Sequence, residues 1–129
     1  MTASAPELST VAIVEDDKAA RDALCSLLES VGLRTEAFGS AEEFVDLGPV
    51  ENSSCLILDV RLPRMSGLEL QRRLSGDKNS TPIIFITGRG DDKVREQTLR
   101  EGAVGFFHKP FDPAALLKVV HSTLKQTGE

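Results

Sequence analysis

The sequence predicts an open α/β fold, in which a five-stranded parallel sheet carries helices on both faces. Five short apolar segments alternate along the chain with five segments of helical periodicity, and a helix between two strands makes them parallel through a right-handed crossover. The central apolar segments lack polar alternation, as expected of strands buried on both faces. A chain of 129 residues suits one such doubly wound domain.

The first half of the chain begins with an apolar strand, Val11–Val14, that leads into an acidic triplet. The helix that follows ends at Gly32, a typical helix-terminating residue. Leu33–Phe38 is a strand polar enough to favour an edge position. The segment Ser40–Glu43 matches a capping box that opens a short helix through Leu47. The apolar face of the first helix is predicted to contain Ala20, Ala23, Leu24, Leu27, Leu28 and Val31.

Cys55–Asp59 is predicted to be the central strand of the sheet, after a turn over Gly48–Ser54. Its apolar run ends abruptly in a carboxylate, and Pro63 stops regular strand pairing soon afterwards. A helix opens at Ser66-Gly67 with two leucines on its apolar face, and a loop over Gly76–Thr81 leads to the next strand. A charge at the end of a buried strand is where open α/β sheets place their ligand chemistry.

The fourth helix is predicted to be weakly anchored. It lies between the strands Ile83–Ile86 and Val104–Phe107, can be capped by Asp91 or Asp92, and runs to Glu101. Its apolar side consists only of Val94, Leu99 and Thr98.

Strand polarity favours the flavodoxin-like strand order 2-1-3-4-5. Because the first strand is apolar and the second is polar, the second is expected to lie outside the first. This order places a ligand crevice between the first and third strands. The closing helix, which carries Leu116, Leu117, Val120 and Leu124, begins with the N-cap Asp112 and Pro113 at its first position.

Composition indicates a cytoplasmic domain with no membrane segment. The net charge of -5 and the pI near 5.1 argue against nucleic-acid binding by this domain alone. Cys25 and Cys55 lie in apolar segments and are expected to be reduced core residues. No apolar run approaches membrane-spanning length, and no signal peptide is apparent. We expect a disordered lead-in over 1–9, one domain over 10–126, and a tail or the start of a linker over 127–129.

Polar side chains follow four of the predicted strands. Glu15 and Asp16 follow the first strand, Asp59 ends the third, Thr87 ends the fourth, and Lys109 follows the fifth. Parallel strands place these side chains along one edge of the sheet, where the carboxylates repel one another unless a cation compensates them. Carboxylate oxygens suit Mg²⁺ or Mn²⁺. Asp59 could then be a nucleophile that forms an aspartyl phosphate, with Thr87 and Lys109 binding phosphoryl oxygens.

Each of these residues alone has a simpler interpretation. The acidic triplet after the first strand could interact with a helix dipole, and Asp59 could cap the next loop. Thr87 could be a turn residue and Lys109 a solvated surface lysine. Their joint placement at four strand ends favours the phosphoryl-transfer interpretation.

The sequence resembles the receiver domain of two-component response regulators over residues 9–126. The resemblance rests on four groups of residues in the order and spacing of that family. Residues 62–67 and 82–88 look closest to nitrogen-fixation regulators whose output is a helix-turn-helix DNA-binding domain. The four groups are 13–17, 58–63 with 65–67, 86–88, and 102–111, of which the last matches at Gly102, Ala103, Phe106 and Lys109-Pro110-Phe111.

This resemblance implies a role for each carboxylate. Asp59 would be the phosphoacceptor and would receive its phosphoryl group from the phosphohistidine of a histidine kinase. The Asp16 and Asp59 carboxylates, with the main-chain carbonyl of Arg61, would bind Mg²⁺. Glu15 would act largely through water.

The resemblance also implies a conformational switch. Thr87 and Lys109 would bind the phosphoryl oxygens, and Phe106 would rotate into the space that Thr87 vacates. The Lys109-Pro110 bond is expected to be cis. Two residues depart from the commoner family pattern, since Glu15 is one methylene longer than Asp and Phe106 lacks a tyrosine hydroxyl. His108 and His121 are expected at the surface.

The implied function is a signalling switch rather than an enzyme. Phosphorylation would reshape the face of the fourth helix, fifth strand and fifth helix, through which two copies could pair. Expected partners are a sensor histidine kinase and a C-terminal DNA-binding output domain, with transcription as the controlled process. The alternatives are a stand-alone phosphorelay shuttle, a pseudo-receiver that binds without phosphorylation, and an aspartyl-phosphate hydrolase of the haloacid dehalogenase type. The hydrolase usually has a second Asp where Arg61 stands.

Overall fold

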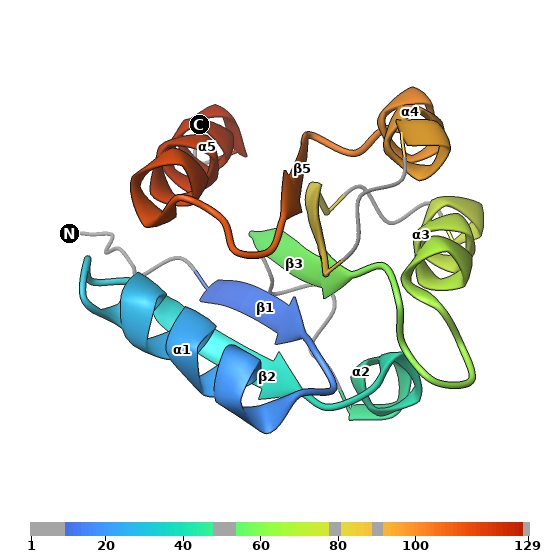
Figure 1. Ribbon diagram of the computed structural model, residues 1–129, viewed down its shortest axis with the longest axis horizontal. Coiled ribbons are helices and arrows are strands. Elements are labelled where there is room, and N and C mark those ends of the chain that lie inside the picture. The colour runs from blue at the N-terminus through green and yellow to red at the C-terminus, as the bar shows by residue number, and fades with distance from the viewer. Residues whose placement is uncertain (1–9, 48–53, 78–80, 89–91, 128–129) are drawn as a thin grey trace, which may run out of the picture.

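The computed structural model describes residues 10–47, 54–77, 81–88 and 92–127. Over these ranges the chain forms one parallel sheet of five strands in the order β2-β1-β3-β4-β5 (Figure 1). The predicted flavodoxin-like order is therefore confirmed, with the polar second strand at an edge. The strands are β1 (Thr10–Val14), β2 (Arg34–Phe38), β3 (Cys55–Asp59), β4 (Ile83–Thr87) and β5 (Gly105–His108).

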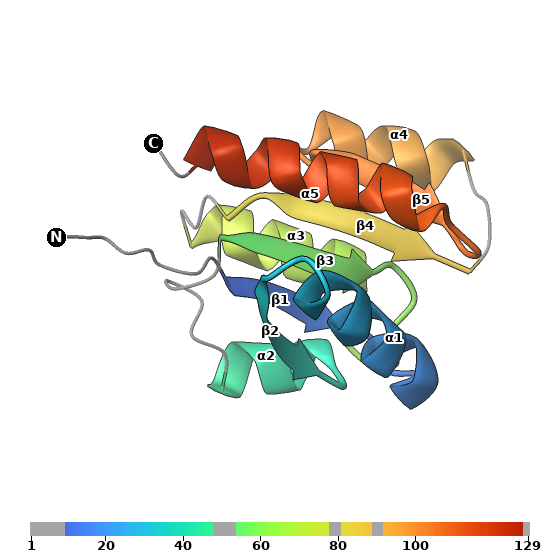
Figure 2. The same ribbon diagram turned by 90° about the vertical axis from the view of Figure 1, so that its left-hand side faces the viewer.

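Helices in the described segments cover both faces of the sheet, as predicted. Figures 1 and 2 show α1 and α5 on one face and α2, α3 and α4 on the other. None of these helices combines the length and the apolarity needed to cross a membrane. The helices are α1 (Lys18–Glu29), α2 (Ala41–Leu47), α3 (Gly67–Gly76), α4 (Asp92–Arg100) and α5 (Pro113–Thr127).

Two apolar cores hold the helices on the sheet. Successive side chains of a strand point to opposite faces, so β3 contributes Ile57 to the core beneath α1 and α5 and Leu58 to the core beneath α2 and α3. Every residue of β3 and β4 is buried. Packing on both faces therefore fixes the two strands that end in Asp59 and Thr87.

The first helix ends earlier than predicted. α1 stops at Glu29, and the N–H groups of Gly32 and Leu33 donate to the carbonyls of Glu29 and Leu28 at 3.0 and 3.2 Å. This is a Schellman pattern, in which Gly32 adopts a φ of 87° that glycine tolerates at little cost. Val31 lies beyond the helix and is 40% exposed, so its placement on the apolar face was wrong.

Ser40 provides only half of the predicted capping box. Its Oγ accepts a hydrogen bond from the Glu43 N–H at 3.0 Å, but Glu43 Oε1 accepts from the Gly39 N–H at 2.6 Å. A complete box occurs at the start of α3, where Ser66 and Glu69 exchange both hydrogen bonds, at 3.1 and 2.8 Å. Local sequence therefore fixes the beginning of α3.

Several predicted boundaries and faces in the second half differ from the structure. α3 includes Gly76, which was predicted to begin a loop. β5 begins one residue after Val104, which is 45% exposed. On α4, Thr98 is fully buried and Val94 is half-buried, whereas Leu99 is exposed. The inward side of α4 therefore contains Val94 and Thr98, and the prediction for Leu99 was wrong.

Other predictions are confirmed or lie beyond the described part of the chain. Asp112 caps α5, since its Oδ1 accepts a hydrogen bond from the Ala114 N–H at 3.1 Å. The predicted boundary between 126 and 127 falls within α5. Cys25 and Cys55 are free thiols, and His108 and His121 are exposed, as predicted. Predictions for residues 1–9, 48–53, 78–80, Asp91 and 128–129 lie outside the described residues.

Gly67 lies directly against the main chain at the end of β3. A Cβ atom at this position would lie 2.3 Å from the Asp59 carbonyl oxygen and 3.0 Å from Val60 Cα. The Gly67 N–H also donates to the Val60 carbonyl at 3.0 Å. This close approach requires a residue without a side chain.

Replacing Gly67 with alanine should lower the free energy of unfolding by about 1–3 kcal/mol, because main-chain atoms must move to admit the methyl group. Gly76→Ala is the matched control, since a Cβ there meets no atom within 4 Å. This control should gain about 0.5–1 kcal/mol from helix propensity. Urea unfolding followed by circular dichroism measures both, and equal effects would contradict the close approach.

Burial should make the Cys55 thiol unreactive. Desolvation raises the pKa of Cys55 from 9.0 to about 12, so the folded state keeps a proton that the unfolded chain releases. The contribution of Cys55 to stability should therefore decline as the pH rises from about 9 towards about 12. Near pH 8, iodoacetamide should alkylate Cys55 in the Cys25→Ser variant only after denaturation. The folded Cys55→Ser variant should react at its half-buried Cys25. Mass spectrometry distinguishes these results, and native alkylation of Cys55 would contradict its burial.

Candidate functional site

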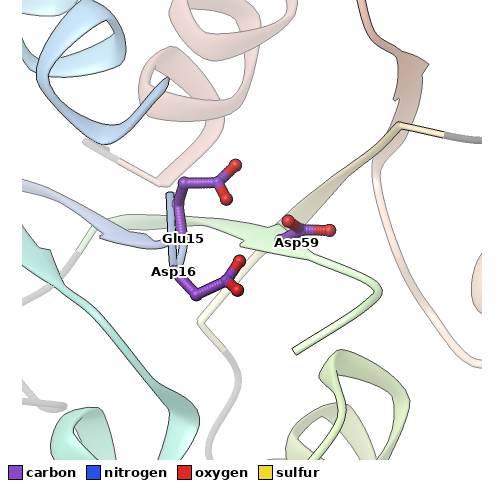
Figure 3. A group of neighbouring side chains, drawn as sticks. All are labelled: Glu15, Asp16 and Asp59. Atoms are coloured by element: carbon purple, nitrogen blue, oxygen red, sulfur yellow. The ribbon is translucent and has the colours of Figure 1, made fainter. Parts of the chain in front are cut away.

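Three carboxylates meet at the carboxyl edge of the sheet. Glu15 and Asp16 follow β1, and Asp59 is the last residue of the neighbouring strand β3 (Figure 3). One carboxylate oxygen from each lies within 4.8 Å of the others. The register of the two strands, with Val14 opposite Leu58, fixes this proximity. The predicted convergence of the three carboxylates is therefore present in the structure.

Glu15 is held from several directions. Its side chain is only 1% exposed, its Oε2 accepts from the Asp17 N–H at 3.1 Å, and its Oε1 accepts from Lys109 Nζ at 2.5 Å. The main chain of Glu15 is also fixed, since its N–H donates to the Phe38 carbonyl at 3.1 Å and Arg21 Nη1 donates to its carbonyl at 2.9 Å. The direction of the Glu15 carboxylate is thus well determined.

Asp59 is buried, and each of its oxygens has a polar contact. The residue is 5% exposed. Its Oδ1 accepts from the Arg61 N–H at 3.0 Å, and its Oδ2 lies at the longer distance of 3.4 Å from Lys109 Nζ. Asp16, in contrast, is exposed. The site therefore has a buried wall and one carboxylate that faces solvent.

Lys109 supplies the positive charge at the site and follows β5, and its peptide bond to Pro110 is cis, as predicted. Burial alone would lower the pKa of Lys109, but the hydrogen bond to Glu15 and the charges of Asp59 and Glu15 outweigh it and raise this pKa. Lys109 is therefore protonated at neutral pH. A single ammonium group still leaves an excess of negative charge beside three carboxylates.

The donor set suits a divalent cation. The donor oxygens of the three carboxylates lie at most 4.8 Å apart. At this distance two negative charges repel by roughly 3 kcal/mol at an effective dielectric constant of about 20. Mg²⁺ and Mn²⁺ prefer carboxylate oxygens and retain water ligands, which the solvent-facing Asp16 allows. The excess negative charge and the carboxylate oxygen ligands thus both favour a divalent cation.

Thr87 and Phe106 lie on the strands beside the carboxylate cluster. Thr87 ends β4 and is buried, and its carbonyl accepts from the Lys109 N–H at 2.8 Å. Phe106 is half-buried on β5. Its ring centroid lies 6.5 Å from that of Phe85 and 5.4 Å, edge to face, from that of His108. The roles expected of Thr87, Phe106 and the Arg61 carbonyl remain predictions.

One contact near the site was not apparent from the sequence. Glu42 on α2 accepts a hydrogen bond from the Met65 N–H at 2.8 Å, across 23 residues of sequence. Arg64, just before Met65, has a φ of 64°. No local pattern marks Glu42, because it lies in the first turn of α2, where the helix dipole favours any acidic residue.

One protein family matches most of the chain. Residues 11–121 match the family described as response regulator receiver domain. The response regulator protein TmoT of Ectopseudomonas mendocina is 46% identical over 118 residues, which are 91% of this chain and 53% of TmoT. The transcriptional regulatory protein FixJ of Azorhizobium caulinodans is 38% identical over 124 residues, which are 96% of this chain and 59% of FixJ.

A solved structure agrees with these sequence relationships. The structure of the response regulator StyR matches with a TM-score of 0.87 and 38% sequence identity, and the match covers 95% of this chain and 62% of StyR. The chain spans between half and three fifths of the length of the two curated relatives.

Removing one carboxylate should stabilise the protein when no divalent cation is present. In a chelating buffer, Asp59→Asn should raise the free energy of unfolding by about 1 kcal/mol, because it relieves repulsion that Lys109 cannot balance. Mg²⁺ at about ten times its dissociation constant should add roughly 1.4 kcal/mol to the wild type and less to Asp59→Asn. Denaturant unfolding with chelator and with Mg²⁺ measures both effects.

Asp46→Asn is the matched control for this prediction. It changes the net charge equally but alters an exposed residue on α2. A gain in stability of the same size for Asp46→Asn, or a wild type that does not respond to Mg²⁺, would contradict a repulsive carboxylate cluster.

Proposed function

Because the chain belongs to the response regulator receiver domain family, we propose that Asp59 accepts a phosphoryl group from a phosphohistidine of a sensor histidine kinase. One observation carries this proposal. The buried Asp59 carboxylate has an oxygen within 4.8 Å of the Glu15 and Asp16 carboxylates, and its Oδ2 lies 3.4 Å from the Lys109 ammonium. Such a cluster combines a nucleophilic oxygen with groups that balance phosphoryl charge.

The proposed reaction is a phosphoryl transfer between two side chains. An Asp59 carboxylate oxygen attacks phosphorus and forms a P–O bond, while the P–N bond to the donor histidine breaks. The electron pair of the broken bond remains on the histidine nitrogen, which takes up a proton. Protein groups contribute mainly position and charge stabilisation, because the transferred group carries its charge on oxygens.

The carboxylates of Asp16 and Asp59, with the main-chain carbonyl of Arg61, would hold Mg²⁺ or Mn²⁺. Glu15 would contribute through water, since its own oxygens already accept hydrogen bonds from Lys109 and the Asp17 N–H. A bound divalent cation supplies charge neutralisation for the phosphoryl oxygens and the attacking carboxylate.

Lys109 and Thr87 would bind the phosphoryl group once it is on Asp59. The Lys109 ammonium already contacts Asp59 Oδ2, so a small movement would bring it to a phosphoryl oxygen. Thr87, at the end of the adjacent strand, would be drawn towards the same group. Phe106 would then turn inward, with its packing against Phe85 in place of a tyrosine hydroxyl contact.

The consequence would be a change in the face formed by α4, β5 and α5. This altered face would pair two copies of the domain or release a C-terminal DNA-binding output domain, and so control transcription. The names of the relatives, response regulator and transcriptional regulatory protein, support this proposal. The domain would act in the cytoplasm as a switch without a turnover reaction of its own and without direct contact to nucleic acid. A stand-alone phosphorelay shuttle is the alternative within the same family.

Incubation with acetyl phosphate and Mg²⁺ should add one phosphoryl group to the wild type and none to Asp59→Asn. Intact-mass spectrometry measures the addition, and peptide mapping should place it on Asp59. A chelator should abolish it if charge neutralisation is required. Equal labelling of Asp59→Asn would overturn the proposal, and continued phosphate release without a labelled intermediate would indicate a hydrolase.

A further inference from the structure

The segment between β3 and α3, residues 60–66, is a closed loop, called here the β3–α3 loop. Its two ends are joined because the Gly67 N–H donates to the Val60 carbonyl at 3.0 Å. The Val60 N–H donates to the carbonyl of Ile86 on β4 at the same distance. The start of the loop is thus part of the sheet edge that carries the candidate site.

The loop touches Asp59 directly. The Arg61 N–H donates to Asp59 Oδ1 at 3.0 Å. The orientation of the peptide group before Arg61 therefore depends on the path of the loop. The Arg61 carbonyl, which is the expected main-chain ligand of the cation, belongs to the next peptide group in the same loop.

The far side of the loop is attached to another helix. Arg64 adopts a φ of 64°, a left-handed conformation that is costly for a residue with a side chain. With this turn, the next N–H, that of Met65, donates to Glu42 Oε2 on α2 at 2.8 Å. Arg64 Nε also lies 3.8 Å from Glu42 Oε1. Glu42 thus compensates for an unfavourable backbone turn by accepting a hydrogen bond from the residue that follows the turn.

We propose that Glu42 is a positioning residue that fixes the β3–α3 loop and thereby holds the Arg61 main chain in the geometry needed for cation binding beside Asp59. This inference rests on the proposed function. Residues that orient metal ligands from outside the coordination sphere commonly change metal affinity when they are replaced. Glu42 differs from them in that it acts through the main chain of Met65, four residues from the ligand Arg61.

A purely local role for Glu42 is the competing explanation. Glu42 lies in the first turn of α2, where any negative charge is favoured by the helix dipole. Glu43 occupies the same turn and accepts from the Gly39 N–H at 2.6 Å, on the side of the β2–α2 connection. It therefore provides a control with the same charge in the same helical turn.

Reach and charge can be separated by two conservative variants. Glu42→Gln keeps the length and an oxygen that can accept from the Met65 N–H, but removes the charge. Glu42→Asp keeps the charge near the helix terminus, but its side chain is one methylene shorter. Glu43→Asp makes the same shortening at the neighbouring position. All three changes are small enough to preserve the fold, which thermal unfolding can verify.

Titration calorimetry with Mg²⁺ on the full chain tests the inference. Glu42→Asp should bind Mg²⁺ about tenfold more weakly than the wild type, and amide hydrogen exchange at Arg61 and Met65 should become faster. Glu42→Gln should remain within about threefold of the wild type. Glu43→Asp should bind as the wild type does. A purely local role of Glu42 in α2 would leave the amide exchange rate of Arg61 unchanged, so this rate distinguishes the two explanations.

The inference is overturned if Glu42→Asp binds Mg²⁺ as tightly as Glu43→Asp, or if Glu42→Gln is as weak as Glu42→Asp. These results leave the proposed function intact, provided that the wild type binds Mg²⁺ and is phosphorylated on Asp59. A wild type that binds no Mg²⁺ would overturn both the inference and the cation-dependent part of the proposed function.

Discussion

The ammonium group of Lys109 lies between two buried carboxylates, and much of the structure serves to keep it there. It is 2.5 Å from Glu15 and 3.4 Å from Asp59, so it interacts mainly with Glu15. Buried charges are tolerated only where partners compensate them. Under the proposed function, this unequal sharing leaves one Asp59 oxygen loosely held and thus available for attack on phosphorus.

The sheet supports this arrangement from below, while the surrounding helices are attached to different extents. β3 and β4 are buried throughout and form a rigid platform. Among the residues 93–100 of α4, whose burial the structure describes, only Thr98 is fully buried. Polar contacts tie α4 to α3, since Gln71 Nε2 donates to the Thr98 carbonyl at 3.1 Å and Arg72 forms two hydrogen bonds of 3.2 Å with Glu101. An element with so few buried residues can move at lower cost than a strand of the core, as the proposed switch requires.

Strand order and the carboxylate cluster could be predicted because both follow from patterns that extend over several residues. Apolar runs identify the strands, and parallel topology then brings Asp59 to Glu15 and Asp16. The failures concern single positions. Val31 has suitable helical spacing but lies past a turn that Gly32 creates, and Leu99 is exposed while the polar Thr98 is buried. Hydrophobicity alone cannot decide such cases, because helix termination and buried hydrogen bonds depend on three-dimensional neighbours.

The contacts that shape the β3–α3 loop were beyond sequence reasoning for a related reason. Gly67 is needed because its Cα packs on the carbonyl of Asp59, and the Met65 N–H meets Glu42 only because Arg64 takes a left-handed turn. Each of these contacts involves a main-chain group, and they leave no hydrophobic period and no spacing of reactive side chains. The groups proposed to carry out the chemistry are therefore visible in the sequence, whereas the groups that hold them in place emerge only from the folded backbone.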